Sequence, residues 1–253
     1  MPRSARKRSR SGIYHIILRG VNQQTIFEDY QDKRRFLETL SRFKEISKYQ
    51  IFSYCLMNNH VHLLIKEVEE EISLAMKRIS SSYVFWYNEK YERSGHLFQE
   101  RFKSESVESR DYFFTVLRYI HQNPLKAGLV KDVFSSRWTS VNEYIDHTNI
   151  IDIDFALNHI SPDRKKAIEM YIEYMKQTNE DQCLEDRVRE RRSDIEVREY
   201  LLQLGVFNTS SLQKMDKESR NAILTRLKTL NGVSIRQLAR ITGVSKSVIQ
   251  RVQ

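Results

Sequence analysis

The chain has 253 residues, of which 40% are hydrophobic, and its formal net charge is +9. This length allows one large domain or two smaller ones, and no stretch reaches the eighteen or so apolar residues that a membrane span requires. Two distant cysteines give no disulfide framework. We therefore expect a cytoplasmic protein with no membrane partner, and the basic charge favours a polyanion such as nucleic acid as the partner.

The N-terminal segment, residues 1–12, is rich in arginine and lysine. It lacks the apolar stretch of a secretory signal, so we expect a basic flexible arm that follows a DNA backbone.

Apolar patterning from residue 13 onward predicts alternating strands and helices. Residues 13–19 have strand propensity, and residues 29–48 place apolar side chains at helical spacing. Two more strands, 50–57 and 60–66, flank the pair Asn58-Asn59, which favours a tight turn. We expect these two strands to form a hairpin.

The pattern continues with a helix over 72–91 and a strand over 97–107. Residues 111–123 are helical and should end before Pro124, because the residue before a proline is disfavoured in a helix. This order of elements predicts an α+β fold: a ferredoxin-like split βαβ domain over 13–148 with a central antiparallel sheet. Helices on one face of that sheet would place the strand 60–66 centrally.

The composition shifts after this domain. We expect residues 149–193 to form a helical connector that contains a charge-dense stretch, and residues 194–253 to form a separate all-α domain. Its segment 233–252 has the features of a helix-turn-helix, because Ser234 and Gln237 have capping-box spacing and Gly243 lies where a tight turn belongs. A three-helix bundle used for protein contacts is the alternative.

Two pairs of residues carry the chemistry. His60 and His62 lie two apart on a predicted strand, so both side chains point to one face, although two core histidines would show the same spacing. Tyr119 and Asn123 lie four apart on a predicted helix and also share a face. If that helix packs beside the hairpin, a phenol and an amide oxygen lie next to two imidazoles.

Such a group of side chains suits phosphodiester chemistry. Two neutral imidazoles and an amide oxygen leave a divalent cation its full charge and open coordination positions. A phenol beside the phosphate can then attack it. The alternatives are that Tyr119 is an ordinary core or surface tyrosine and that Asn123 is a helix C-cap before Pro124. His121 should point about 200° away from Tyr119 and is expected to be structural, whereas His15 and His96 remain unplaced.

Three motifs occur in order, NNHVHLLI, SGHLFQERFKS and LRYIHQNPLKAGLV. They resemble the single-tyrosine HUH transposases of the IS200/IS605 type, in particular the REP-associated tyrosine transposases, over roughly residues 10–145. The resemblance implies a nuclease and strand transferase that cleaves single-stranded DNA at hairpins through a 5′-phosphotyrosine. It makes His60 and His62 ligands of Mg or Mn and Tyr119 the nucleophile. Asn123 stands where the insertion-sequence members have glutamine as third ligand, with Gln122 as the fallback.

Several basic residues are candidates for binding DNA. The basic and aromatic stretch 93–103 suits a single strand, because cations bind phosphates and rings stack on bases, although Phe98 and Phe102 would also fit the core side of a strand. The second helix of the helix-turn-helix would present groove-reading side chains to duplex DNA. The residues that we predict to bind DNA are Arg19, Arg101, Lys103, Arg118, Arg236, Lys246, Ser247, Gln250 and Arg251.

Two other functions fit the same residues. In a non-catalytic, sequence-specific DNA-binding regulator, the HUH site would be vestigial. In a metal-dependent phosphoesterase, water would attack and a general base would be needed, which the sequence does not reveal. A homodimer is compatible with each.

Overall fold

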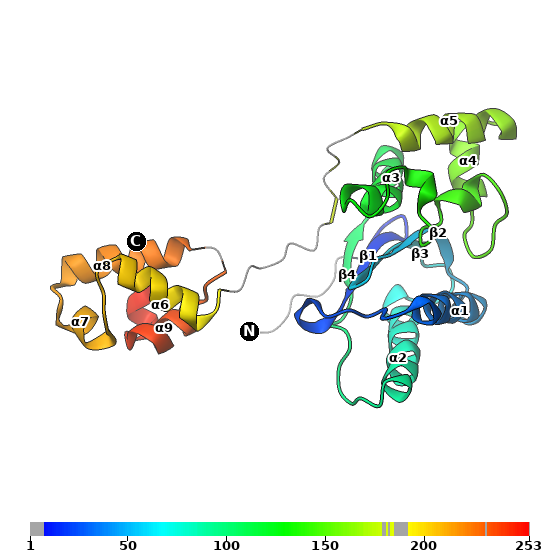
Figure 1. Cartoon of the computed structure of the whole chain (residues 1–253). Helices are drawn as coiled ribbons and strands as arrows, with labels where there is room; N and C mark the ends of the chain where they lie inside the picture. Colours follow the sequence, from blue (N-terminus) through cyan, green and yellow to red (C-terminus); the bar gives the residue numbers. More distant parts are fainter. Residues whose placement is uncertain (1–7, 179–180, 182, 185–191, 231, 253) are drawn as a thin grey trace. The chain divides into compact units, whose positions relative to one another are not determined.

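The computed structural model describes residues 8–178, 181, 183–184, 192–230 and 232–252, and the chain divides into two compact units between residues 185 and 186 (Figure 1). The elements of the first unit are β1 (Ile13–Arg19), η1 (Val21–Gln23), α1 (Tyr30–Ser47), β2 (Gln50–Leu56), β3 (His60–Lys66), α2 (Ile72–Lys90), β4 (Lys103–Ser106), α3 (Arg110–Lys126), η2 (Val133–Ser135), η3 (Val141–Tyr144), α4 (Asp154–Ile160) and α5 (Arg164–Lys176). Those of the second are α6 (Asp194–Gln203), α7 (Thr209–Lys214), α8 (Lys217–Thr229), α9 (Ile235–Thr242) and α10 (Lys246–Arg251).

The first unit is built on a four-stranded sheet in the order β2-β3-β1-β4, and every pairing is antiparallel. This confirms the predicted ferredoxin-like plan, with β3 as an inner strand. In the register of β1 and β3, Ile17 lies opposite His62 and Arg19 lies opposite His60. Because side chains alternate along a strand, His15 and Arg19 share the face of the two β3 histidines.

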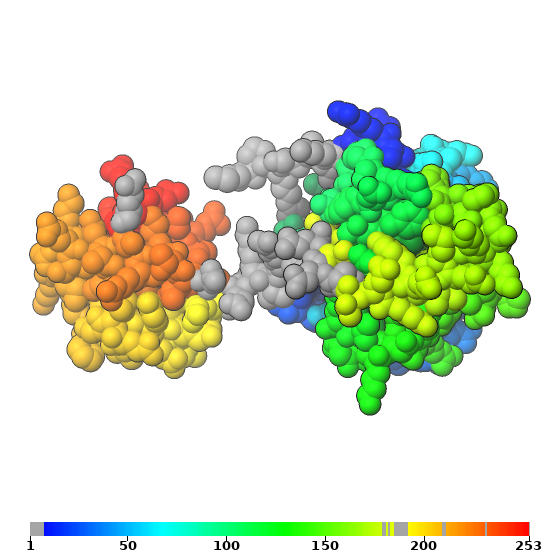
Figure 2. Space-filling view, turned by 90° about the horizontal axis from the view of Figure 1, so that it is seen from above, coloured from blue at the N-terminus to red at the C-terminus, as the bar shows by residue number. Residues whose placement is uncertain are grey.

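Helices cover both faces of the sheet. Figure 1 shows α1 and α2 on one face and α3, α4 and α5 on the other, so the expectation of helices on one face was wrong. The reason lies in the strands, since β1 and β3 are buried at successive positions and therefore present apolar side chains to both faces. Figure 2 looks onto the second face, where the green and yellow-green residues of α3, α4 and α5 cover the sheet.

Strand β4 is shorter than the predicted strand 97–107. Phe98 forms only an isolated bridge to Gly20, and residues 99–102 are not strand. Phe98 and Phe102 are nevertheless buried in the core. The even spacing of these two phenylalanines therefore predicted their burial correctly but not their pairing in a strand. Arg101 lies in the stretch that is not strand and is outside the sheet.

Helix α3 runs through Pro124 to Lys126 rather than ending before the proline. The proline lies in the last turn, where it removes a single backbone hydrogen bond. The turn is still closed by a hydrogen bond of 2.9 Å from the N–H of Ala127 to the carbonyl of Asn123. Gly128 then takes a positive φ of 69°, a conformation that suits glycine and ends the helix.

The segment 149–193, expected to be a connector, contributes to the core of the first unit. Helices α4 and α5 place Ala156, Leu157, Ala167, Tyr171 and Met175 in the same buried cluster as the sheet. The break between the two units therefore follows α5 instead of preceding α4.

Part of the expected flexible arm is packed. Residues 1–7 lie outside the described residues, but the hydroxyl of Ser11 donates to the carbonyl of Val107 at 2.6 Å. The backbone N–H of Arg10 donates to the carboxylate of Glu108 at 3.0 Å. Residues 10–11 are thus held beside the end of β4.

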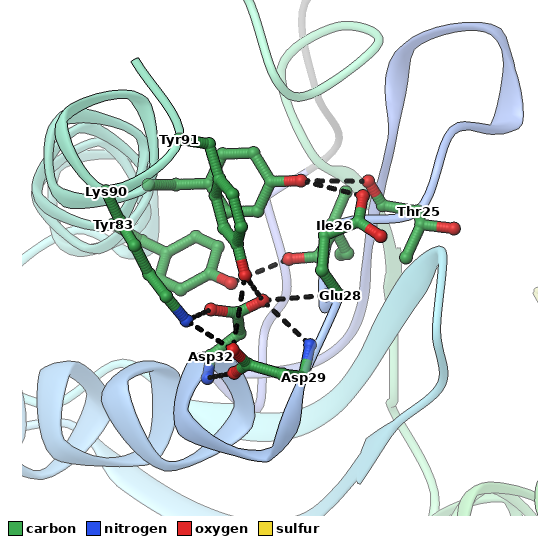
Figure 3. Close-up of polar contacts among 9 residues, drawn as sticks. Thr25, Ile26, Glu28, Asp29, Asp32, Tyr83, Lys90 and Tyr91 are labelled. Carbon is green, nitrogen blue, oxygen red and sulfur yellow. Dashed lines mark hydrogen bonds and ion pairs between the residues drawn. The ribbon is translucent and has the colours of Figure 1, made fainter. Parts of the chain in front are cut away.

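A buried carboxylate joins α1 to α2 (Figure 3). Asp32 is fully buried, lies 2.7 Å from the amine of Lys90 and accepts from the hydroxyl of Tyr91 at 2.8 Å. It also accepts from the backbone N–H of Glu28 at 2.7 Å and completes a capping box with Asp29. The network therefore fixes the start of α1 and the loop that enters it.

The second unit has its own apolar core, formed by residues that include Leu201, Leu224, Leu227, Leu238 and Ile249. The side chain of Ser234 caps α9 by accepting from the backbone N–H of Gln237, and Gly243 ends the helix with a positive φ of 70°. Over the residues described in both units, no helix is long and apolar enough to span a bilayer.

Candidate active site

The central residues of the candidate site lie together on the face of the sheet that α3 covers. The ring centroids of His60 and His62 are 4.9 Å apart, and that of Tyr119 on α3 lies 5.7 Å from that of His62. Tyr119 is 8% exposed. The ammonium of Lys126, seven residues further along α3, lies 5.3 Å from the centre of the tyrosine ring. A phenol, a cation and two imidazoles thus converge from two elements.

A third histidine completes the cluster. His15 on β1 is fully buried, its ring stacks on that of His62 at 5.3 Å, and its Nε2 lies 3.0 Å from the Nδ1 of His62. Its ring also meets that of Tyr119 edge-on at 5.8 Å. Sequence reasoning left His15 unplaced, because its position beside His62 depends on the register between β1 and β3. The sequence contains one signal for His15: side chains alternate along a strand, which places His15 and Arg19 on one face of β1.

Burial keeps the inner histidines neutral. It lowers the pKa of His15 to about 3. It also holds the pKa of His62 well below its usual value, and the neighbouring His15 and His60 act in the same direction. At neutral pH both rings are therefore uncharged, which is the form of imidazole that binds a metal ion.

His60 is oriented by its neighbour in the turn. Its Nδ1 lies 2.7 Å from the Oδ1 of Asn59. If that nitrogen donates its proton to the amide oxygen, the lone pair of the ring is on Nε2. A second hydrogen bond of this kind is what holds the tautomer of a metal-binding histidine.

The two amides after Tyr119 point in different directions. The Nδ2 of Asn123 donates to the carbonyl of Tyr119 at 2.9 Å, which leaves an amide oxygen as the other polar atom of this side chain. Gln122 is buried and donates to the carbonyls of Met175 and Gln177 at 2.8 and 2.9 Å. Its amide therefore joins α3 to the end of α5, and Gln122 is not a suitable fallback ligand.

His121 is structural, as predicted. Its Nε2 lies 2.9 Å from the hydroxyl of Ser140, and its Nδ1 lies 2.9 Å from the hydroxyl of Tyr171. Burial lowers its pKa to about 3. His96, the other unplaced histidine, is exposed in the loop before β4.

The residues present partly fit a divalent cation. Among the described residues, no group of three or more His, Cys, Asp or Glu side chains is arranged to hold a metal ion. With metal–nitrogen bonds of about 2.1 Å, two imidazoles whose centroids lie 4.9 Å apart can nonetheless reach one cation. The structure thus brings two imidazole donors together, and the amide oxygen of Asn123 stays a predicted third ligand.

The predicted DNA-binding residues of the first unit divide into two groups. Arg19 lies opposite His60, Lys103 on β4 lies opposite Ile17, and both are on the histidine face; Arg101 is exposed just before β4. Arg118 differs, because its guanidinium forms a two-pronged ion pair with Asp181 at 2.9 and 3.0 Å and its side chain is 11% exposed. We therefore assign Arg118 a structural role.

In the second unit, the predicted DNA-binding residues are exposed. Arg236 lies on α9, and the others lie on α10, a helix of only six residues: Lys246, Ser247, Gln250 and Arg251. Ile249 of α10 is buried, whereas the adjacent Val248 is 37% exposed.

One comparison with known proteins covers the residues of this site. Residues 9–123 match the family model described as "Transposase IS200 like", and a search of curated proteins found no match. A solved structure entitled "Structure of the REP associates tyrosine transposase bound to a REP hairpin" has 18% sequence identity and a TM-score of 0.49, over 61% of this chain and 90% of that chain. The family match contains β1, both β3 histidines and Tyr119, and it ends at Asn123. Residues 9–123 of this chain are therefore similar to the IS200-like transposase family.

Proposed function

We propose that the first unit is a metal-dependent, single-stranded DNA nuclease and strand transferase that acts at DNA hairpins. The observation that carries the proposal is the contact of the Tyr119 ring with the rings of His62 and His15, in a domain similar to the IS200-like transposase family. A purely structural role accounts for only part of this cluster. In particular, the Nδ1 of His15 is buried without a hydrogen-bond partner among the described residues.

His60, His62 and Asn123 would hold Mg or Mn, which when bound draws electron density from a phosphodiester oxygen. Arg19 and Lys103 lie on the same face and would hold the phosphates of the strand on either side. A phenol is a weak nucleophile, so the protein has to align the Tyr119 oxygen with the phosphate.

The step exchanges one phosphate ester for another. The phenol oxygen of Tyr119 forms a bond to phosphorus while the bond from phosphorus to the 3′-oxygen breaks. The phenol gives up its proton, and the released oxygen gains one and becomes a free 3′-hydroxyl. The 5′-phosphate stays on the tyrosine as an ester, so attack by another 3′-hydroxyl reverses the step and joins DNA without ATP.

The test uses an end-labelled hairpin oligonucleotide with single-stranded flanks, incubated with the full chain and Mn²⁺. We expect cleavage and a protein–DNA adduct that survives denaturing electrophoresis, and loss of both with EDTA or in His60→Ala and His62→Ala. Tight binding without cleavage under all metal conditions would favour the non-catalytic regulator. Cleavage without an adduct would favour a phosphoesterase that uses water.

For the second unit we propose binding to duplex DNA through α9 and α10. The support is that Arg236, Lys246 and Arg251 are exposed while Leu238, Ile241 and Ile249 form the packed side. The double variant Lys246→Ala/Arg251→Ala should weaken duplex binding and leave hairpin cleavage unchanged. Equal duplex affinity in the variant would favour a protein-contact module.

A further inference from the structure

Two aromatic rings meet at the outer edge of β2, away from the residues assigned above. Tyr30 begins α1 and is 42% exposed, and Trp138 is half-buried in the chain that follows η2. Their ring centroids are 4.8 Å apart and the rings are inclined by 75°. More than a hundred residues separate them in the sequence, so the fold brings them together.

Two cations flank these rings. The guanidinium of Arg137 lies 4.3 Å from the centre of the Tyr30 ring, and the amine of Lys33 lies 5.3 Å from that of Trp138. Within the described part of the chain, neither cation forms an ion pair with a carboxylate. Partial burial also lowers the pKa of Lys33. An anion at this position would therefore meet two positive charges that are not neutralised.

The rings lie near the candidate active site. The carbonyl of Trp138 accepts from the backbone N–H of Leu56 at 2.8 Å, and Thr139 forms an antiparallel bridge with Cys55. Cys55 in turn lies opposite His62 on β3. Trp138 is thus two strand spacings, or about 10 Å, from the histidine strand. The amine of Lys33 also donates to Asn58 Oδ1 in the turn that precedes His60.

A purely structural clamp explains only part of this arrangement. It accounts for the inner side of Trp138, which packs on the core. It does not account for an exposed tyrosine ring with a guanidinium stacked on it, or for two cations that form no ion pair with a described carboxylate. Exposed aromatic surface beside free positive charge is the combination that binds unpaired bases and their phosphates.

We propose that Tyr30 and Trp138 form a platform on which one unpaired base of the DNA strand stacks, with Arg137 and Lys33 at its phosphate. The inference rests on the proposed function, since it assigns a second contact to the strand that Tyr119 would cut. It predicts that the platform binds single-stranded DNA and ignores a blunt duplex.

The experiment makes Trp138 the only reporter. The chain has two tryptophans, so the full chain carrying Trp86→Phe leaves Trp138 as the sole source of tryptophan fluorescence. We expect a twelve-residue oligothymidylate to quench this emission saturably, and a blunt-ended hairpin to leave it unchanged. In the same background, Tyr30→Ala and Arg137→Gln should each weaken binding of the oligothymidylate about 5- to 10-fold, a typical loss for one stacked base.

Two controls separate stacking from folding. Tyr30→Phe keeps the ring and should bind like the parent. Phe85→Ala removes a ring that is 74% exposed on α2 and should also bind like the parent. Binding measured by fluorescence anisotropy with no change in Trp138 emission would overturn the platform while leaving cleavage by Tyr119 intact. Absence of any DNA binding would overturn the platform and the proposed function together.

Discussion

The Nε2 of His15 lies 3.0 Å from the Nδ1 of His62, and the opposite nitrogen of His15 is buried without a hydrogen-bond partner among the described residues. A neutral imidazole carries one N–H. If His62 donates from Nδ1, its own Nε2 keeps a lone pair for a cation, and the proton of His15 lies on its unpartnered Nδ1. If His15 donates instead, His62 loses that lone pair. His15 thus decides which tautomer His62 adopts.

Replacing His15 should therefore weaken metal binding without removing a ligand. We expect His15→Leu to lower the affinity for Mn²⁺ about 10- to 100-fold, as is usual when the hydrogen-bond partner of a ligand is lost. His15→Gln, which retains an acceptor, should recover part of the loss. The measurement is free Mn²⁺ by electron paramagnetic resonance, which is independent of cleavage. Equal affinities of both variants and the native protein would show that His15 serves packing alone.

The buried carboxylate of Asp32 should be important for stability. Asp32→Ala removes the buried carboxylate that binds the amine of Lys90 and the hydroxyl of Tyr91, and leaves the lysine with the exposed Asp29. Removing one partner of a buried ion pair typically costs about 3–5 kcal/mol of unfolding free energy. Urea denaturation followed by tryptophan fluorescence tests this, because both tryptophans lie in the first unit.

Asp29 provides the matched control for Asp32. It binds the same lysine at 2.7 Å but its side chain is 48% exposed. Asp29→Asn should lose less than about 1 kcal/mol, because an exposed ion pair contributes little and asparagine still caps a helix. Equal losses for the two variants would contradict the role of the buried network.

Arg118 should affect stability more than DNA binding. Arg118→Met breaks the pair with Asp181 and leaves a carboxylate that is 12% exposed, so we expect a loss of up to about 3 kcal/mol of unfolding free energy. Affinity for single-stranded DNA should stay within about twofold of the native value, whereas Arg19→Met should reduce it clearly. A selective loss of DNA affinity in Arg118→Met would restore the assignment made from the sequence.

The buried His121 predicts how stability depends on pH. Its pKa is about 3 in the folded protein and about 6.5 in an unfolded chain. Below pH 6.5 the unfolded chain binds a proton that the folded protein does not, so the unfolding free energy falls as the pH drops from 6.5 toward 3. The expected slope for this residue is on the order of 1 kcal/mol per pH unit. His121→Asn should show a smaller slope between pH 6.5 and 5, and an unchanged slope would disprove the contribution.

The sequence predicted local elements better than the contacts between them. Strands β1 to β3 and helices α1 and α2 were placed within one or two residues, because amphipathic spacing and turn residues are local signals. The helix end at Pro124 was wrong, since a proline in the last turn costs only one hydrogen bond.

What the sequence did not show at the site were contacts between residues distant along the chain. Nothing near Arg118 shows that Asp181, sixty-three residues later, binds it. His15 could not be joined to His62 without the register of β1 and β3. By contrast, His60, His62 and Tyr119 were singled out from local motifs, and the fold brings His62 and Tyr119 into contact, while their chemical roles stay predictions.

The most direct test of the central claim is to locate the covalent bond. After reaction with a labelled hairpin and Mn²⁺, the adduct is digested with protease and nuclease, and the modified peptide is sequenced by mass spectrometry. We expect a single nucleotide phosphate on Tyr119 and no adduct with Tyr119→Phe, which should still bind the hairpin. A phosphate on another residue, or an equally abundant adduct in Tyr119→Phe, would contradict the assignment of Tyr119 as the nucleophile.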